Sequence, residues 1–514
     1  MYIMTNREKQ TAGTLAAVPA PAPICSAGGE ALELVRPGCD LMSVERKDGL
    51  RSFFDPRSIA VFGSMREPVG EGLTAVRNML EFGFGGRVFP ISRSTTEVLA
   101  LRAYPDLEAV DEPPELALVI TPPPTVLPIL EQCGRRGVRA AIVATEGFAE
   151  AGPDGAALQQ ELVRTARRFG MRLLGPNTLG VLNTARGLVT DPYPLRGNKP
   201  PAGGVSYCTQ TGFLTFGVHP IRDIGCPISK ICDFGNKCDV NEADILPYLA
   251  DDESTKAICL HLEDIKDGQR FLEAARMAVA RKPVLVLRPG RSAAGARAAS
   301  SHTGSLAGND LVYENALRQA GVIRLRTWRE YWETPKALSM LPLPRGNRVA
   351  IVTATGGAGV ILVDAAADAG LVPASFGPST RRLLAGLSPR MGGNPVDVGP
   401  LMSVRDDPFN VYLDVVPAIL ADPGVDCLAM VCHLGQPIVE VLTTLAPDIA
   451  RSGKPVTTFG YGIDLPDMQQ SARRVEALGL PAYLDLESAV KALGAAAAYV
   501  RRRALLEGRP WAGR

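Results

Sequence analysis

One pattern recurs three times along this chain: a short apolar strand, a tight turn of small residues, and then a helix. It occurs over residues 59–64, 204–212 and 348–359. Between these copies, apolar strands such as 116–120 and 140–144 alternate with helical periodicity. Continuous apolar strands separated by helices are typical of parallel sheets that are covered on both faces. The pattern therefore predicts an α/β protein.

The chain divides at two Pro- and Gly-rich joins, over residues 191–201 and 341–346. Its length of 514 residues corresponds to about three domains. Residues 1–50 are rich in Ala and Pro and show no clear period, so we expect a mobile extension there. The expected domains follow it and cover residues 51–190, 200–335 and 346–505.

Charge and hydropathy exclude several classes of partner. With 55 basic and 54 acidic residues the net charge is +1, which gives no basic field for nucleic acid. No apolar run reaches the roughly 18 residues that span a bilayer, and the N-terminus lacks the apolar core of a signal peptide. The ten cysteines show neither C-x-x-C nor paired-ligand spacing, which favours reduced, buried thiols. We therefore expect a cytoplasmic protein that binds neither nucleic acid nor membranes and has no metal site of its own.

His302, one of four histidines in the chain, lies in a run of small residues over 295–308. Nothing bulky flanks it, so we expect a loop in which another molecule can approach the imidazole ring. An imidazole is neutral and nucleophilic near neutral pH and can carry a group covalently. The N–H and O–H groups around it could bind an anion. The alternative for this run is a plain turn.

Small-residue turns that start helices are candidate phosphate sites, because helix N-termini offer free N–H groups to anions. One such turn opens the second expected domain at 209–212, and another opens the third at 355–359. Two helix N-termini aimed at one histidine would stabilise a phosphohistidine, which carries about two negative charges. The candidate phosphate-binding residues are Thr209, Thr211, Gly212, Gly357, Ala358 and Gly359.

Glu263 is the candidate partner of His302, since it follows an apolar strand at 257–260. A carboxylate that accepts from one ring nitrogen would fix the tautomer and leave the other nitrogen as the nucleophile. The alternative is that Glu263 is an ordinary surface acid.

The first expected domain offers a cofactor site at the turn that runs from Gly63 to Gly72. This turn departs from G-x-G-x-x-G, and the second strand ends in a neutral to basic stretch with Arg93, where NAD-binding domains place an acidic residue. Such an end disfavours NAD and suits a phosphorylated ribose, as in NADP or coenzyme A, unless Arg93 is only a solvated surface residue. Two more small-residue segments follow strands of this domain, at 121–124 and 175–181.

Several motifs together resemble the NDP-forming acyl-CoA synthetases, the superfamily of succinyl-CoA synthetase, and most closely the alpha subunit of ADP-forming acetate–CoA ligase. The resemblance covers about residues 52–500. The motifs are GPNTLG at 175–180, FGNKCDV at 234–240, GRS at 290–292, SHTGSLAG at 301–308 and GNPVD at 393–397.

The resemblance implies a Rossmann-like CoA-binding domain followed by two flavodoxin-like parallel-sheet domains of the succinyl-CoA synthetase type. It also implies a reaction in which ATP phosphorylates His302, the phosphoryl group passes to a carboxylic acid, and the CoA thiol attacks the acyl phosphate. Glu263 would orient His302, while Thr211-Gly212 and Gly357–Gly359 would hold the phosphate. The residues in segments that line the CoA site are Gly63, Ser64, Pro122, Glu146 and Asn177, to which the basic strand end adds Arg93.

The ATP-grasp domain of this family, which holds ATP and Mg²⁺, does not occur in this sequence. We therefore expect a separate ATP-grasp beta subunit and a hetero-oligomer. One alternative is a non-catalytic CoA-binding sensor or assembly protein of the same fold, and another is an NADP oxidoreductase. The motifs leave open which carboxylic acid is the substrate and in which direction the reaction runs.

Overall fold

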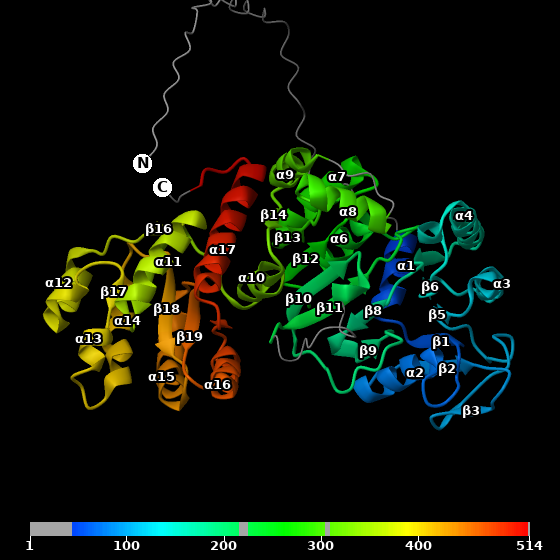
Figure 1. The fold of residues 1–514 in the computed structure, drawn as a ribbon, viewed down its shortest axis with the longest axis horizontal. Helices are drawn as coiled ribbons and strands as arrows, with labels where there is room; N and C mark the ends of the chain where they lie inside the picture. The colour runs from blue at the N-terminus through cyan, green and yellow to red at the C-terminus, as the bar shows by residue number, and fades with distance from the viewer. Residues whose placement is uncertain (1–43, 215–224, 304–308, 512–514) are drawn as a thin grey trace, which may run out of the picture. The chain divides into compact units, whose positions relative to one another are not determined.

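Three large sheets, each accompanied by helices, make up a computed structural model of the chain (Figure 1). The structure describes residues 44–214, 225–303 and 309–511. The predicted α/β class with parallel sheets is confirmed. Most of the expected mobile extension, residues 1–43, lies outside the described residues.

The first sheet has five parallel strands in the order β2-β1-β5-β6-β7. Its strands are β1 (Ser58–Gly63), β2 (Arg87–Ile91), β5 (Leu116–Ile120), β6 (Ala140–Val143) and β7 (Arg172–Leu174). Its helices are α1 (Val44–Phe54), α2 (Glu71–Phe82), α3 (Pro123–Arg135) and α4 (Pro153–Arg168), and β3 (Glu97–Val98) and β4 (Leu101–Arg102) form a small hairpin. Along the sheet, β2 lies on one side of β1 and β5 lies on the other. The strand order therefore reverses between β1 and β5, and a crevice opens at their carboxyl ends.

The second sheet has seven strands in the order β14-β13-β12-β10-β11-β8-β9, in which β8 runs antiparallel to both of its neighbours, β11 and β9. Its strands are β8 (Val181–Asn183), β9 (Leu188–Val189), β10 (Ala202–Thr209), β11 (Ile228–Asp233), β12 (Ala257–His261), β13 (Val284–Leu287) and β14 (Ile323–Leu325). Its helices are α6 (Glu242–Asp251), α7 (Gly268–Arg281), α8 (Ala293–Thr303), α9 (Asp310–Gln319) and α10 (Trp328–Met340).

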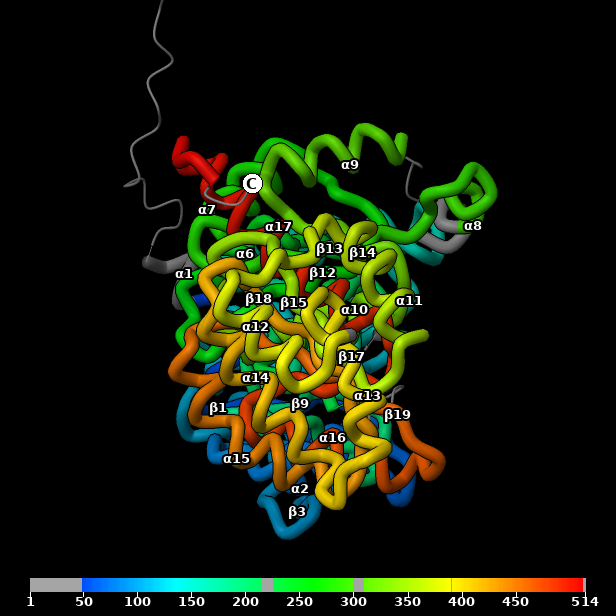
Figure 2. Tube along the Cα trace, turned by 90° about the vertical axis from the view of Figure 1, so that its left-hand side faces the viewer, coloured from blue at the N-terminus to red at the C-terminus, as the bar shows by residue number. Residues whose placement is uncertain are grey.

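The third sheet has six strands, five in the order β16-β15-β18-β19-β20 and a short β17 that also pairs with β15. Its strands are β15 (Arg348–Thr353), β16 (Val372–Pro373), β17 (Val396–Asp397), β18 (Cys427–His433), β19 (Val456–Tyr461) and β20 (Ala482–Tyr483). Its helices are α11 (Gly356–Asp368), α12 (Pro378–Leu387), α13 (Gly399–Met402), α14 (Val411–Ala421), α15 (Gln436–Ser452), α16 (Leu465–Ala477) and α17 (Leu486–Leu506). Figure 2 views this part of the chain from the side of α12 and α15.

Alternate residues of β15 serve two separate cores. Ala350 and Val352 pack with apolar residues of α12, α14 and α15 on one face. Val349 and Ile351 pack with α11 and α17 on the other face. The continuous apolar sequence of this strand therefore follows from its burial on both faces.

Three local expectations differ from the structure. Helix α1 begins at Val44, inside the stretch where we expected an extension. The strands β8 and β9 fall within the expected first domain, but β8 pairs with β11 of the second sheet. The prediction of a loop around His302 is wrong for residues 293–303, which form helix α8. The alanines that precede His302 favour a helix.

Candidate functional site

The carboxyl ends of the first and second sheets line one cavity of about 1310 Å³. Strand ends and the turns that follow them supply its wall, which is where parallel sheets bind ligands. Seven of the residues predicted from the sequence line it: Gly63, Ser64, Pro122, Glu146, Asn177, Thr211 and Gly212. The structure thus brings together the expected cofactor segments of the first sheet and the first expected phosphate turn.

The turn after β1 depends on a close approach between Gly63 and Gly72. A Cβ atom on Gly72 would lie 2.9 Å from the Gly63 carbonyl carbon, so only glycine allows α2 to start directly above the end of β1. The backbone N–H of Leu73 also donates to the Ser64 oxygen at 3.0 Å. Although the turn lacks G-x-G-x-x-G, it still places a helix start at the cavity.

The segment that carries Asn177 is held against the second sheet by Asp233. The two carboxylate oxygens of Asp233 accept from the backbone N–H groups of Leu179 at 2.8 Å and of Gly235 at 3.3 Å. Gly235 has φ +53°, and a Cβ there would lie 2.2 Å from the Pro176 oxygen. Burial raises the pKa of Asp233 to about 6. The Asn177 side of the cavity is therefore fixed by a buried carboxyl group.

The first expected phosphate turn contains two threonines, Thr209 and Thr211. Thr209 is fully buried. Its hydroxyl donates to the Thr211 backbone oxygen at 2.9 Å and accepts from the Thr211 N–H at 3.1 Å. Thr209 therefore supports the turn from behind, while Thr211 and Gly212 line the cavity. The described residues after this turn form a 3-10 helix over Gly212–Leu214.

Glu263 follows β12, next to this turn. Its backbone N–H donates to the Gln210 side-chain oxygen at 2.9 Å. The neighbouring carboxylate of Asp264 pairs with Lys237, whose side chain is fully buried, at 2.7 Å. Burial by itself would raise the pKa of Asp264, but Lys237 and the hydrogen bond from Gln210 hold it below its ordinary value.

The second expected phosphate turn repeats the geometry of the first. The Thr353 hydroxyl donates to the Thr355 oxygen at 2.6 Å and accepts from its N–H at 3.1 Å. The Thr355 hydroxyl accepts from the Ala358 N–H at 3.3 Å and so caps α11. Gly357, Ala358 and Gly359 stand at this helix start, but none of them lines the 1310 Å³ cavity.

The two remaining predicted residues are His302 and Arg93. His302 belongs to the last turn of α8, and its side chain lies outside the described part of the structure. The described side chains of α8 are exposed or half-buried, and Figure 2 shows this helix standing apart from α9. Arg93 is exposed and does not line the cavity.

Several polar residues that line the cavity were not predicted, because their side chains meet only when the ends of separate strands, turns and helices come together. Those with charged or amide side chains are Arg66, Glu71, Glu150, Gln159, Gln210, Asp233, Asn236, Asp264 and Lys266. Burial would raise the pKa of Glu150, but hydrogen bonds from Asn236 and from backbone N–H groups hold it low. Burial lowers the pKa of Lys266. Asn236 and Gln210 were visible only as members of longer motifs.

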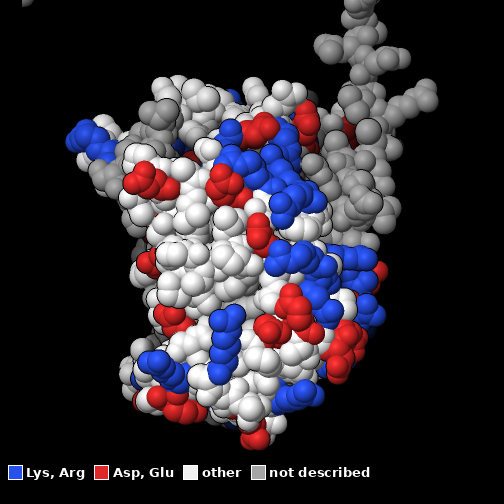
Figure 3. Space-filling view, turned by 90° about the vertical axis from the view of Figure 1, so that its right-hand side faces the viewer, with Lys and Arg blue, Asp and Glu red and all other residues white. Residues whose placement is uncertain are grey.

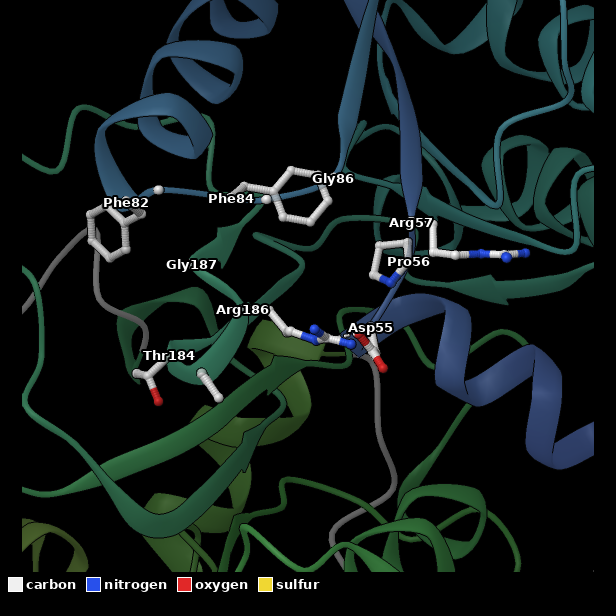
Figure 4. A pocket seen from close by; sticks show the side chains of 12 residues that line it. Asp55, Pro56, Arg57, Phe82, Phe84, Gly86, Thr184, Arg186 and Gly187 are labelled. Carbon is white, nitrogen blue, oxygen red and sulfur yellow. Dashed lines mark ion pairs between the residues drawn. The ribbon is translucent and has the colours of Figure 1, made fainter.

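A smaller cavity of about 430 Å³ lies at the opposite, amino-terminal end of β1. Figure 4 shows Arg186 directed toward Asp55, with which it forms an ion pair, and Phe82 and Phe84 on the far side. None of the predicted site residues lines it. Its two arginines, Arg57 and Arg186, already pair with Glu115 and Asp55. It therefore offers an anion less than the larger cavity does.

The face of the first sheet's helices in Figure 3 carries basic and acidic side chains side by side. On α3 and α4, Arg168 pairs with Glu131 at 3.7 Å, and Arg164 pairs with Glu161. Within the described ranges, no helix is long and apolar enough to cross a membrane. In the same ranges, no three His, Cys, Asp or Glu side chains are grouped to hold a metal ion.

Comparison with known proteins adds family evidence to this geometry. The profile of a CoA binding domain matches residues 57–184, and that of a succinyl-CoA ligase like flavodoxin domain matches residues 202–338. The alpha subunit of acetate–CoA ligase (ADP-forming) I from Pyrococcus furiosus is 33% identical over 457 residues, which are 87% of this chain and 96% of that subunit. The alpha subunit of isoenzyme II from the same organism is 36% identical over 445 residues, 84% of this chain and 93% of that subunit.

A solved structure agrees in fold over nearly the same length. It is the dinucleotide forming acetyl-coenzyme A synthetase 1 of Ca. Korarchaeum cryptofilum in complex with phosphate and ADP. The TM-score is 0.81 at 32% identity, and the match covers 90% of this chain and 99% of that chain.

Proposed function

The chain belongs to the family of ADP-forming acid–CoA ligases, and from that premise we propose that it is the CoA-binding, phosphohistidine-bearing subunit of such an enzyme. The reaction converts a carboxylic acid, ATP and CoA to acyl-CoA, ADP and phosphate. The observation that carries this proposal is the single cavity shared by the CoA-binding segments Gly63–Ser64, Pro122 and Asn177 and by the turn Thr211–Gly212.

The proposed sequence of steps uses His302 as a carrier. One imidazole nitrogen attacks the terminal phosphorus of ATP and ADP leaves. A carboxylate oxygen of the acid then attacks the same phosphorus, so the N–P bond breaks and an acyl phosphate forms. Finally the CoA thiol, which loses its proton, attacks the acyl carbon and phosphate leaves. Such phosphoryl transfer depends on positioning and charge neutralisation.

The residues of this chain supply that positioning. Glu263 is proposed to accept the N–H of one ring nitrogen of His302, which keeps the other nitrogen available for phosphate. The N–H groups at Thr211–Gly212 and at Gly357–Gly359 are proposed to stabilise the phosphoryl oxygens in turn. The cavity beside Gly63, Pro122, Glu146 and Asn177 is proposed to hold CoA, with Arg93 near its phosphorylated ribose.

Nucleotide chemistry is proposed to come from a second chain. Two relatives that match over 96% and 93% of their length are alpha subunits. This favours a separate ATP-grasp beta subunit that binds ATP with Mg²⁺, and a hetero-oligomer of the two. A cytoplasmic location, where ATP and CoA are available, stays a prediction.

The decisive experiment needs this chain alone. The purified protein is incubated with radiolabelled phosphate and a panel of acyl-CoAs, and the protein is tested for acid-labile, base-stable label. We expect label on the wild type and on His433→Ala, a control in the third sheet, and none on His302→Ala. The acyl-CoA that gives most label identifies the acid.

The opposite outcome is equally informative. A chain that binds CoA but takes up no label from any acyl-CoA, alone or with an ATP-grasp partner, would contradict the proposed catalysis. It would instead favour a CoA-binding sensor.

A further inference from the structure

We propose that Gln210 is a positioning residue that sets the place of Glu263 relative to the phosphate turn. The proposal rests on the proposed function, in which Glu263 orients His302. It concerns a side chain that has no charge to offer and whose role follows only from its contacts.

The side-chain amide of Gln210 makes three hydrogen bonds to two successive residues. Its oxygen accepts from the N–H of Glu263 at 2.9 Å and from the N–H of Asp264 at 3.2 Å. Its nitrogen donates to the Asp264 carboxylate at 2.6 Å. The backbone N–H of Gln210 also donates to the His261 oxygen at 3.2 Å. One residue after β10 thus holds the whole turn after the neighbouring strand β12.

An amide is the side chain that fits these partners. The backbone N–H groups of Glu263 and Asp264 require an acceptor, while the Asp264 carboxylate requires a donor. A carboxylate at position 210 would satisfy the first requirement and repel the second partner, and an alkyl side chain would satisfy neither. The contact therefore predicts a strict requirement for glutamine.

A buried ammonium group closes the other side of the same turn. Lys237 pairs with the Asp264 carboxylate at 2.7 Å and donates to the Asp264 backbone oxygen at 2.8 Å. Its side chain is fully buried and also pairs with Glu242 at 3.2 Å. Asp264 is thus held between Lys237 and Gln210, and Glu263 is the residue joined directly to it.

The position of Gln210 in the chain connects these contacts to the proposed reaction. It stands between Thr209 and Thr211, inside the turn proposed to bind the phosphoryl group. One side chain therefore joins the group that binds phosphate to the group that orients the histidine. A misplacement of about 1 Å in such a constellation can cost about 100-fold in rate.

The test measures phosphohistidine formation from acyl-CoA and phosphate in a double-mutant cycle. We expect Gln210→Ala to lower the labelling rate about 10- to 100-fold in the wild-type background. It should cost little more in a Glu263→Gln background, since the positioned group is already lost. Gln269→Ala is the matched control, because that amide lies on α7 and bonds to Glu273.

A second variant separates positioning from loss of folding. Gln210→Glu should recover activity as the pH falls, because a proton shared between the introduced carboxyl group and Asp264 restores a donor. If the rate losses of Gln210→Ala and Glu263→Gln multiply in the double variant, and Gln210→Glu shows no recovery at low pH, the positioning role is wrong. The proposed function would still stand. A wild type without label would overturn the proposed function and this inference together.

Discussion

At the scale of single residues, one buried histidine makes the fold sensitive to acid. His261 ends β12 beneath the proposed site, and burial together with nearby Lys237 lowers its pKa from 6.5 to about 4. Between pH 6.5 and pH 4, His261 is therefore protonated in the unfolded chain and neutral in the folded chain. Stability is unaffected above pH 6.5, falls as the pH drops below it, and reaches its full loss near pH 4.

We expect His261→Gln to remove this loss. Between pH 7 and pH 5 the wild type should lose about 2 kcal/mol more unfolding free energy than the variant. Asp233 acts in the opposite sense, since its raised pKa favours the folded state on acidification, but it is common to both proteins and cancels. Urea unfolding at the two pH values measures the difference, and equal losses in both proteins would refute the assignment.

At the scale of elements, the start of α2 is set by the contact between Gly63 and Gly72 and not by a capping side chain. The N-cap residue is Gly70, which has no side chain that could cap the helix. Instead the packing of Gly72 on Gly63 brings the helix N-terminus to the cavity. A Cβ on Gly72 would lie 2.9 Å from the Gly63 carbonyl carbon and 3.1 Å from the Met65 methyl group.

Gly72→Ala should therefore push α2 away from β1. We expect a stability loss of about 1–3 kcal/mol and an affinity for CoA at least about 10-fold weaker, because α2 borders the proposed CoA site. Gly85→Ala is the control, since a Cβ there meets open space. Titration calorimetry with CoA measures the effect, and unchanged affinity in Gly72→Ala would separate this turn from CoA binding.

Some strands and site residues could be predicted from the sequence, and others could not. Buried parallel strands such as β5 were predictable because their apolar runs reflect burial on both faces. The antiparallel pairing of β8 with β11 was not, because short strands depend on partners far away in sequence. In the site, glycines and the Thr-x-Thr-Gly turn were visible as motifs. Gln210 and Lys237 acquire a role only when the ends of separate strands meet.

At the scale of the whole described molecule, α17 and α10 join the second and third sheets. The Tyr499 hydroxyl of α17 donates to the Val279 oxygen of α7 at 3.1 Å. From α10, Lys336 pairs with Glu476 of α16 at 2.6 Å and donates to the Ala482 oxygen at 2.6 Å. Lys336 is 5% exposed, so this is a buried charge contact, and it lies beside an apolar cluster in which Ala337 of α10 packs with Tyr483 of β20 and with α17.

Removing one member of a buried ion pair leaves the other charge uncompensated, which costs about 3–5 kcal/mol. We therefore expect Lys336→Met to lower the melting temperature and to split one calorimetric transition into two as the third sheet uncouples. Adding Glu476→Gln should restore part of the loss, because the orphaned charge is removed. Lys491→Met breaks an exposed pair with Glu487 and should cost less than about 0.5 kcal/mol. If Lys336→Met melts in one transition like the wild type, the two sheets are coupled by apolar contacts of α17 with α10 and not by this ion pair.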